Sequence, residues 1–351
     1  MALTAEMAAG WRCDLQGQIQ PASSSATQRK TATINIGGYA RPEDDSFLSY
    51  PEWYIVWSYQ EKADYQHQHL PSGFPYFGAV RQYWGSYCCI SRLIRGEYRF
   101  NGGEQVMLIV IGSSFSAEYI LKGVYEKTIG KLSEWSSDYQ PTEEDQFAYT
   151  VAREYADFVH VRPFYEFHFA KHVSELWRNT HVFGPHSVRK WERKLFLSAD
   201  YIIEAFYCWV IEELTHVSYG YEPSETYAWV ENASSQILQT VPHVTIRSQV
   251  GPDAFVLEIP RYQEFTTVTE SLARSDVRFV EIAGNSQITL SLLAPKEWDY
   301  HDPDAHQLFT TVILSNPEES RMLLVCPVKS LSAAVARLQA GGAMIEHIYD
   351  Y

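Results

Sequence analysis

The segment of residues 103–135 constrains the fold more than any other part of this 351-residue chain. It begins with almost continuous apolar residues at 106–111, continues through small residues, and ends as an amphipathic helix that carries Lys122, Lys127 and Lys131. An apolar helix of this kind has to be covered, either by other helices or by lipid. The question for each remaining segment is therefore whether it can pack against this helix.

The first half of the chain has the spacing of a helical bundle. Apolar and aromatic residues recur at helical intervals across residues 49–220, and turn-forming residues such as those at 101–103 divide them into six predicted helices. We expect the first helix to begin at Pro51, because proline suits the first position of a helix. Aromatic residues make up 15% of the chain, so the bundle should be aromatic-rich. Residues 1–48 are predicted to be an irregular arm in which only TATINIG has strand character.

From residue 241 onward the pattern changes to short strands that alternate with two amphipathic helices. Residues 256–284 and 323–351 share one plan of strand, proline, helix, turn and strand, which indicates a weak internal repeat within residues 241–351. Two such units describe a ferredoxin-like, split βαβ sandwich, and residues 221–240 are predicted to form a helix that bridges it to the bundle. The predicted fold class is therefore α+β, an all-helical domain followed by an α/β sandwich.

The best pattern for metal binding lies on two of the predicted helices. His168, His172 and Glu175 fall on one face of the fifth helix, and Glu213 and His216 form a Glu-x-x-His pair on the sixth. Imidazole and carboxylate ligands of this kind hold transition metals such as iron in helical bundles. Because the full di-metal pattern has two Glu-x-x-His pairs and this chain has one, capping, surface and core roles compete with a metal site.

Two apolar stretches raise the question of a membrane. Residues 105–125 contain Glu118 and residues 195–217 contain Glu204, so neither stretch would cross a bilayer alone. A hairpin of the two could bury these acids between its helices, provided that Lys122, a hydroxyl group or a ligand lies against them. The alternative is a soluble or peripheral protein in which the two stretches are the most buried helices of the bundle.

Four basic residues near the start of the sixth predicted helix form a second candidate ligand site. Arg189, Lys190, Arg193 and Lys194 could hold an anion or the headgroups of anionic lipids, with a solvated helix face as the alternative. Glu118 and Glu204 complete the set of candidate ligand-binding residues.

Composition excludes some classes of partner. The net charge is −15, with 28 Lys and Arg against 43 Asp and Glu, which argues against nucleic acid as a partner. The five cysteines are odd in number and lack metal-type spacing, so we expect reduced core thiols. No basic segment followed by an apolar run stands at the N-terminus, so we expect a cytoplasmic or peripherally membrane-associated protein.

Two functions fit these observations. The first is an accessory or binding protein, whose helical domain holds an apolar small molecule, a lipid or a protein partner and whose ferredoxin-like domain mediates interaction or regulation. The alternative is a metal-dependent oxidoreductase that uses the histidines and glutamates of the helical domain.

Overall fold

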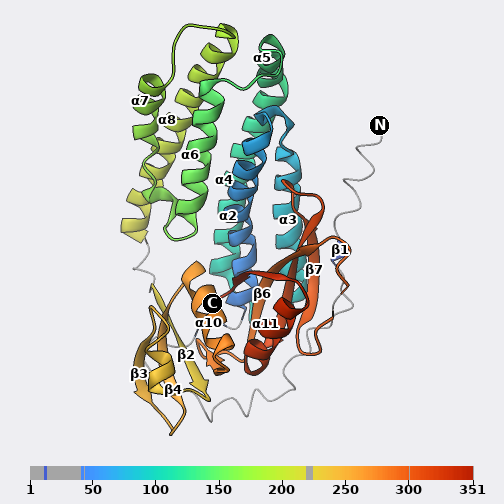
Figure 1. Cartoon of the computed structure of the whole chain (residues 1–351), viewed down its shortest axis with the longest axis vertical. Helices are drawn as coiled ribbons and strands as arrows, with labels where there is room; N and C mark the ends of the chain where they lie inside the picture. Colours follow the sequence, from blue (N-terminus) through green and yellow to red (C-terminus); the bar gives the residue numbers. More distant parts are fainter. Residues whose placement is uncertain (1–11, 14–40, 43, 219–223, 300, 351) are drawn as a thin grey trace.

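The computed structural model describes residues 12–13, 41–42, 44–218, 224–299 and 301–350, without the side chains of 12–13 and 214–218. Helices from the first half of the chain stand together as a bundle, and strands from the second half lie at one end of it (Figure 1). The predicted mixture of helix and sheet, with the helices first, is confirmed. The predicted strand TATINIG lies outside the described residues.

The bundle contains four long helices and several shorter ones. They are α2 (Asp45–Gln68), α3 (Tyr76–Leu93), α4 (Gly102–Tyr125), α5 (Lys131–Ser136), α6 (Glu143–Val159), α7 (Phe169–Asn179) and α8 (Ser187–Ser218), with 3₁₀ turns η1 (Pro71–Gly73) and η3 (Phe164–Glu166). The π-helical turn η2 (Glu126–Gly130) joins α4 to α5. The start predicted at Pro51 is wrong, because α2 begins at Asp45. Pro51 is tolerated in the second turn, where its missing N–H costs one early backbone hydrogen bond.

Aromatic side chains fill the core between α2, α3 and α4. Tyr54, Tyr83, Phe115 and Tyr119 are buried in one cluster and contact each other edge to face or tilted. At Gly112 of α4, a Cβ atom would overlap the Tyr83 ring, so glycine lets α3 and α4 approach closely. The predicted aromatic-rich helical region is confirmed.

The cysteines differ in part from the prediction of five reduced thiols. Cys88, Cys208 and Cys326 are free, whereas Cys89 on α3 forms a disulfide. The sequence could not indicate this, because spacing along the chain does not report distance in the fold.

The strands form two antiparallel sheets. The first sheet contains β2 (Glu225–Glu231), β3 (Thr245–Gln249), β4 (Phe255–Pro260) and β5 (Arg278–Ile282), in the order β3-β4-β2-β5. The second contains β6 (Gln287–Pro295), β7 (His306–Val312), β8 (Glu319–Pro327) and β9 (Met344–Ile348), in the order β7-β8-β6-β9 with β1 (Arg12–Cys13) on its edge. A short helix, α9 (Ser235–Leu238), follows β2, while α10 (Gln263–Arg274) connects β4 to β5 and α11 (Leu331–Ala340) connects β8 to β9.

The two sheets have the same connectivity. Leaving out α9 and β1, each sheet is built from three strands, one helix and a fourth strand, paired in the order second, third, first, fourth. Pro260 and Pro327, which the sequence comparison aligned, each end the third strand of their unit. The ferredoxin-like arrangement is not confirmed, because it requires one sheet built from two βαβ units and the strands here pair in two sheets.

The bridging helix predicted for residues 221–240 is also wrong. Residues Glu225–Glu231 form β2, an inner strand between β4 and β5, and only α9 is helical. Thr226, Ala228 and Val230 alternate inward along β2, which is the period of a strand. A segment that started at residue 241 would lack this inner strand of the first sheet.

The second sheet packs against the bundle. Tyr50 of α2 lies in one core cluster with Phe309, Leu323 and Tyr349 of the sheet region. Arg321 on β8, which is 3% exposed, bonds to Glu61 of α2 at 2.7 Å and to Glu346 of β9 at 2.7 and 2.8 Å. The bundle and the second sheet therefore share one core and a buried ion-pair network.

Candidate functional site

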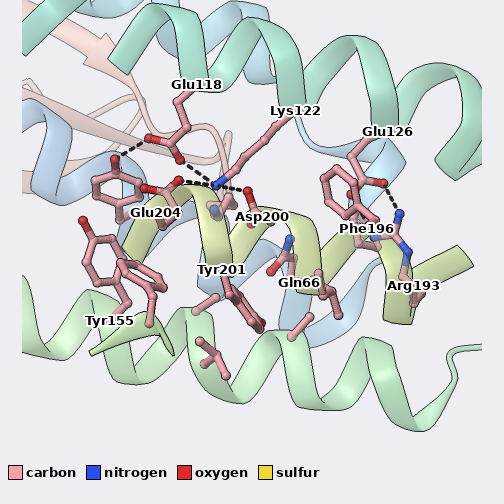
Figure 2. Close-up of a pocket in the computed structure, with 18 of the residues that line it drawn as sticks. Gln66, Glu118, Lys122, Glu126, Tyr155, Arg193, Phe196, Asp200, Tyr201 and Glu204 are labelled. Carbon is pink, nitrogen blue, oxygen red and sulfur yellow. Dashed lines mark hydrogen bonds and ion pairs between the residues drawn. The ribbon is translucent and has the colours of Figure 1, made fainter. Parts of the chain in front are cut away.

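A cluster of charged side chains lies inside the bundle between α4 and α8. The ammonium nitrogen of Lys122 lies 2.8 Å from Glu118 Oε1, 3.0 Å from Glu204 Oε1 and 3.1 Å from Asp200 Oδ1 (Figure 2). We name these four residues the Lys122 cluster. Glu118 and Lys122 are four residues apart on α4, as Asp200 and Glu204 are on α8, so each helix presents both side chains on one face.

A lysine, a hydroxyl group or a ligand was expected to contact the two glutamates, and in the structure a lysine and a hydroxyl group do so. Lys122 contacts both Glu118 and Glu204, and the Tyr59 hydroxyl donates a hydrogen bond of 2.7 Å to Glu118 Oε2. The lysine comes from α4 and the hydroxyl group from α2.

A cavity of about 60 Å³ adjoins the cluster. Its walls come from α2, α4, α6 and α8 and their flanking turns, and they include Tyr59, Lys62, Gln66, Tyr76, Tyr155, Arg193 and Tyr201 as well as the Lys122 cluster. A buried water needs at least about 10–15 Å³ of space, so the cavity is large enough to hold water. The wall of the cavity therefore combines charged side chains with aromatic ones.

The two glutamates of the cluster have pKa values shifted in opposite directions: that of Glu204 is raised and that of Glu118 is lowered. Burial raises the pKa of Glu204 to about 7, and repulsion from Glu118 and Asp200 acts in the same direction. The attraction of Lys122, which lowers this pKa, does not outweigh them. Burial also disfavours the ionised form of Glu118, but Lys122 and Lys62 outweigh it and lower the pKa of that carboxyl group. The pKa of Lys122 is raised well above its usual value, because the three acids outweigh the cost of burying the ammonium group.

The four basic residues of α8 are placed differently from the prediction. Arg189, Lys190, Arg193 and Lys194 are all buried inside the bundle. Arg193 Nη1 lies 2.8 Å from Glu126 Oε1, as Figure 2 shows. The nearest acidic partners of Arg189, Lys190 and Lys194 are Asp145 at 2.6 Å, Glu143 at 3.1 Å and Glu144 at 3.3 Å, respectively. Because these four side chains are buried and paired with acidic residues of the bundle, the prediction of a surface site for anionic headgroups is wrong.

The predicted metal ligands are brought together only in part. His168 caps the start of α7 and is exposed, because η3 takes up the preceding turn and the helix begins one residue later. His172 is buried, and its Nδ1 lies 2.8 Å from Glu175 Oε2. Glu213 is exposed on α8, and the side chain of His216 lies outside the described residues. Among the side chains that are described, no group of three or more His, Cys, Asp or Glu is placed to hold a metal ion.

The exposed surface of α4 and α8 is apolar. Large side chains more than 40% exposed there are Val106, Ile109, Val110, Ile120, Leu121 and Val124 on α4, and Leu195, Ile202, Ile203, Phe206 and Trp209 on α8. We name this surface the α4/α8 apolar face. The charged residues within 106–124 and 195–209 are the four of the Lys122 cluster, which all point inward. Charge therefore lies inside the bundle here, and apolar surface outside.

One helical stretch of the described residues, Gly102–Ser136, is long and apolar enough to cross a membrane, with a mean hydropathy of 1.3 and 28% of its apolar window buried. No second described helix meets the same criterion, so the spanning hairpin of residues 105–125 and 195–217 is not supported. A soluble or peripherally associated protein is compatible with this finding.

The opposite side of the bundle is polar. Arg153 of α6 pairs with Asp64 of α2, and Lys171 of α7 pairs with Glu154 of α6, with all four side chains 41–47% exposed. These pairs place charged groups at the surface of α2, α6 and α7.

Comparison with known protein families, curated proteins and solved structures finds no match to this chain.

Proposed function

We propose that this protein is a membrane-associated binding protein that rests on lipid through its α4/α8 apolar face. The observation that carries the proposal is the distribution of charge, because α4 and α8 expose no charged side chain within 106–124 and 195–209. Large exposed apolar surfaces on water-soluble proteins mark interaction sites.

The chemistry of the face favours lipid over a protein partner. Ser113 and Trp209 are the only exposed residues within 106–124 and 195–209 whose side chains can form hydrogen bonds. Protein interfaces carry about one hydrogen bond per 100–200 Å², and this face offers few groups that could form them. Hydrocarbon, in contrast, requires no hydrogen-bonding partner.

The polar side of the bundle indicates how it lies on the membrane. The ion pairs Arg153–Asp64 and Lys171–Glu154 remain half-exposed on α6, α7 and α2, so this side faces water. A bundle that is apolar on one side suits an orientation along the membrane surface, as amphipathic helices adopt. Lys127 and Lys131 are exposed just beyond the apolar part of α4, where they can contact headgroup phosphates.

The C-terminal sheets suit a second role in this proposal. They lie at the end of the bundle and leave the α4/α8 apolar face uncovered (Figure 1). The shared core with α2 and α3 fixes them to the bundle, so a protein partner bound to the sheets would be held at the membrane. We assign interaction or regulation to this region.

Flotation of the full chain with phosphatidylcholine vesicles tests the proposal. The protein should float with the vesicles and remain bound at high salt, because apolar contacts are not screened. Leu121 is 71% exposed, so its burial in lipid contributes about 1 to 2 kcal/mol, and Leu121→Glu should weaken partitioning at least about tenfold. Thr150→Glu adds the same charge to the exposed side of α6 and should leave flotation unchanged.

Two results would overturn membrane binding through this face. One is failure of the wild-type chain to float with any vesicle composition. The other is a stable dimer in light scattering that Leu121→Glu converts to a monomer, since the face would then join two copies of the chain.

A further inference from the structure

We infer that the Lys122 cluster and its cavity form a proton-binding site, in which one proton is held among Glu118, Asp200 and Glu204 inside the bundle. This inference is independent of membrane association, because it concerns only the interior of the helical bundle. Its basis is the balance of charge, the unpartnered hydroxyl groups of the cavity and the room for water.

The charges of the site do not balance when every group is ionised. Three carboxylates face two ammonium groups, Lys122 and Lys62, so one negative charge remains uncompensated. Asp200 and Glu204 both contact the Lys122 ammonium group, at 3.1 and 3.0 Å, so they also repel each other. An unpaired buried charge is costly, and two carboxylates that share a site raise the pKa of one of them. One bound proton removes the imbalance.

The cavity contains hydroxyl groups that require a partner. Tyr76, Tyr155 and Tyr201 are 2%, 8% and 4% exposed and line the cavity. Their hydroxyl groups make no hydrogen bond to the part of the chain that the structure describes. Buried hydroxyl groups are normally paired with protein or ordered water, and a cavity large enough for water can supply these partners. Water beside the carboxyl groups gives the proton a donor and an acceptor.

Glu204 is the group that carries the proton. The groups that face it are Glu118 and Lys122 from α4, Tyr59 and Lys62 from α2, and Tyr155 from α6. Asp200, Tyr207 and Cys208 approach from α8 itself. Burial and its acidic neighbours raise the pKa of Glu204 to about 7, whereas the pKa of Glu118 is lowered by two lysines. Glu204 therefore exchanges its proton with cavity water near neutral pH.

Infrared difference spectroscopy of the full chain during a pH titration measures this proton directly. A carbonyl band of a protonated carboxylic acid should disappear with a midpoint of about 7 as the pH rises. The band should be absent in Glu204→Gln and unchanged in Glu154→Gln, which removes an exposed carboxylate on α6. Persistence of the band in Glu204→Gln, or a single midpoint at the ordinary value of 4.5, would overturn the assignment.

Asp200→Asn provides a second test that does not remove the proposed proton carrier. The change keeps the shape of the side chain and removes one negative charge, so the remaining two carboxylates balance the two lysines. The midpoint of the Glu204 band should fall by about 1 to 2 pH units, because a like charge has been removed from the site. An unchanged midpoint in a folded Asp200→Asn protein contradicts the charge balance on which the inference rests.

Discussion

Replacing Lys122 with methionine removes the one cation that contacts all three acids of the Lys122 cluster. Methionine keeps most of the apolar length of lysine, so the change tests charge rather than packing. In the wild-type protein the side chains of the cluster are 12–18% exposed, which makes this a buried network. Removing one partner of a buried ion pair costs about 3–5 kcal/mol, because the remaining charges stay buried without compensation. Lys122→Met should lower the free energy of unfolding by that amount at neutral pH.

The loss should depend on pH in a defined direction. The folded pKa of Lys122 is raised well above 10.5, so the stability it contributes is fully present below 10.5 and is lost only above that pH. Without Lys122, the folded pKa values of the three carboxyl groups rise, and the protein gains stability as they are protonated. The difference between the variant and the wild type should therefore be largest above neutrality and should shrink as the pH falls toward the ordinary value of 4.5 for a glutamate.

Thermal unfolding followed by circular dichroism at several pH values provides the measurement. A loss of 3–5 kcal/mol corresponds to a fall in Tm of roughly 4–7 °C, because an unfolding entropy of about 2.1 cal/mol/K per residue amounts to about 0.74 kcal/mol/K for 351 residues. Lys131→Met is the matched control, because Lys131 is exposed one helical segment further along and its replacement should change stability by less than about 0.5 kcal/mol. Equal Tm values for Lys122→Met and Lys131→Met, or a deficit that does not vary with pH, would refute the reasoning.

Two further changes test how the bundle packs and how it joins the sheets. Gly112→Ala should destabilise the protein by about 1–3 kcal/mol in a denaturant titration, because the new Cβ overlaps the Tyr83 ring. Gly103→Ala is the control, because a Cβ atom at this position near the start of the same helix meets no close neighbour; it should leave the stability of the protein unchanged or raise it by up to about 1 kcal/mol. A similar loss of stability at both positions would contradict the close packing of α3 against α4 at Gly112. Arg321→Met leaves Glu61 buried without its cation, so it should lower the free energy of unfolding by about 3–5 kcal/mol. It should also speed limited proteolysis between the bundle and the sheets. Unchanged proteolysis would argue against this network.

Some features of the site follow from local spacing. The pairs Glu118–Lys122 and Asp200–Glu204 are each four residues apart, so a helix must place both members on one face. The cost of burying an acid also predicts that Lys122, a hydroxyl group or a ligand lies against the glutamates. The strand pattern of β2 was equally readable, since Thr226, Ala228 and Val230 alternate, but it was interpreted as a helix.

Other features depend on residues that are far apart in the sequence. Arg193 meets Glu126 across 67 positions, and Lys122 meets Glu204 across 82. No local pattern distinguishes these buried pairs from a solvated basic helix face, which is why the basic residues of α8 were predicted to bind anions. The same holds for the sheets, because the strand order depends on pairing between distant segments.

Local periodicity indicates that residues 103–135 begin as an apolar helix and that Glu118 and Lys122 share one face of it, because residues four apart lie on the same side of a helix. Only the tertiary structure decided which side of that helix is covered. Leu108 and Leu121 belong to the same apolar stretch, yet Leu108 is fully buried and Leu121 is 71% exposed. The physical reason is that burial depends on which helices pack against α4, and α2, α3 and α8 cover its polar and aromatic side while its aliphatic side stays open.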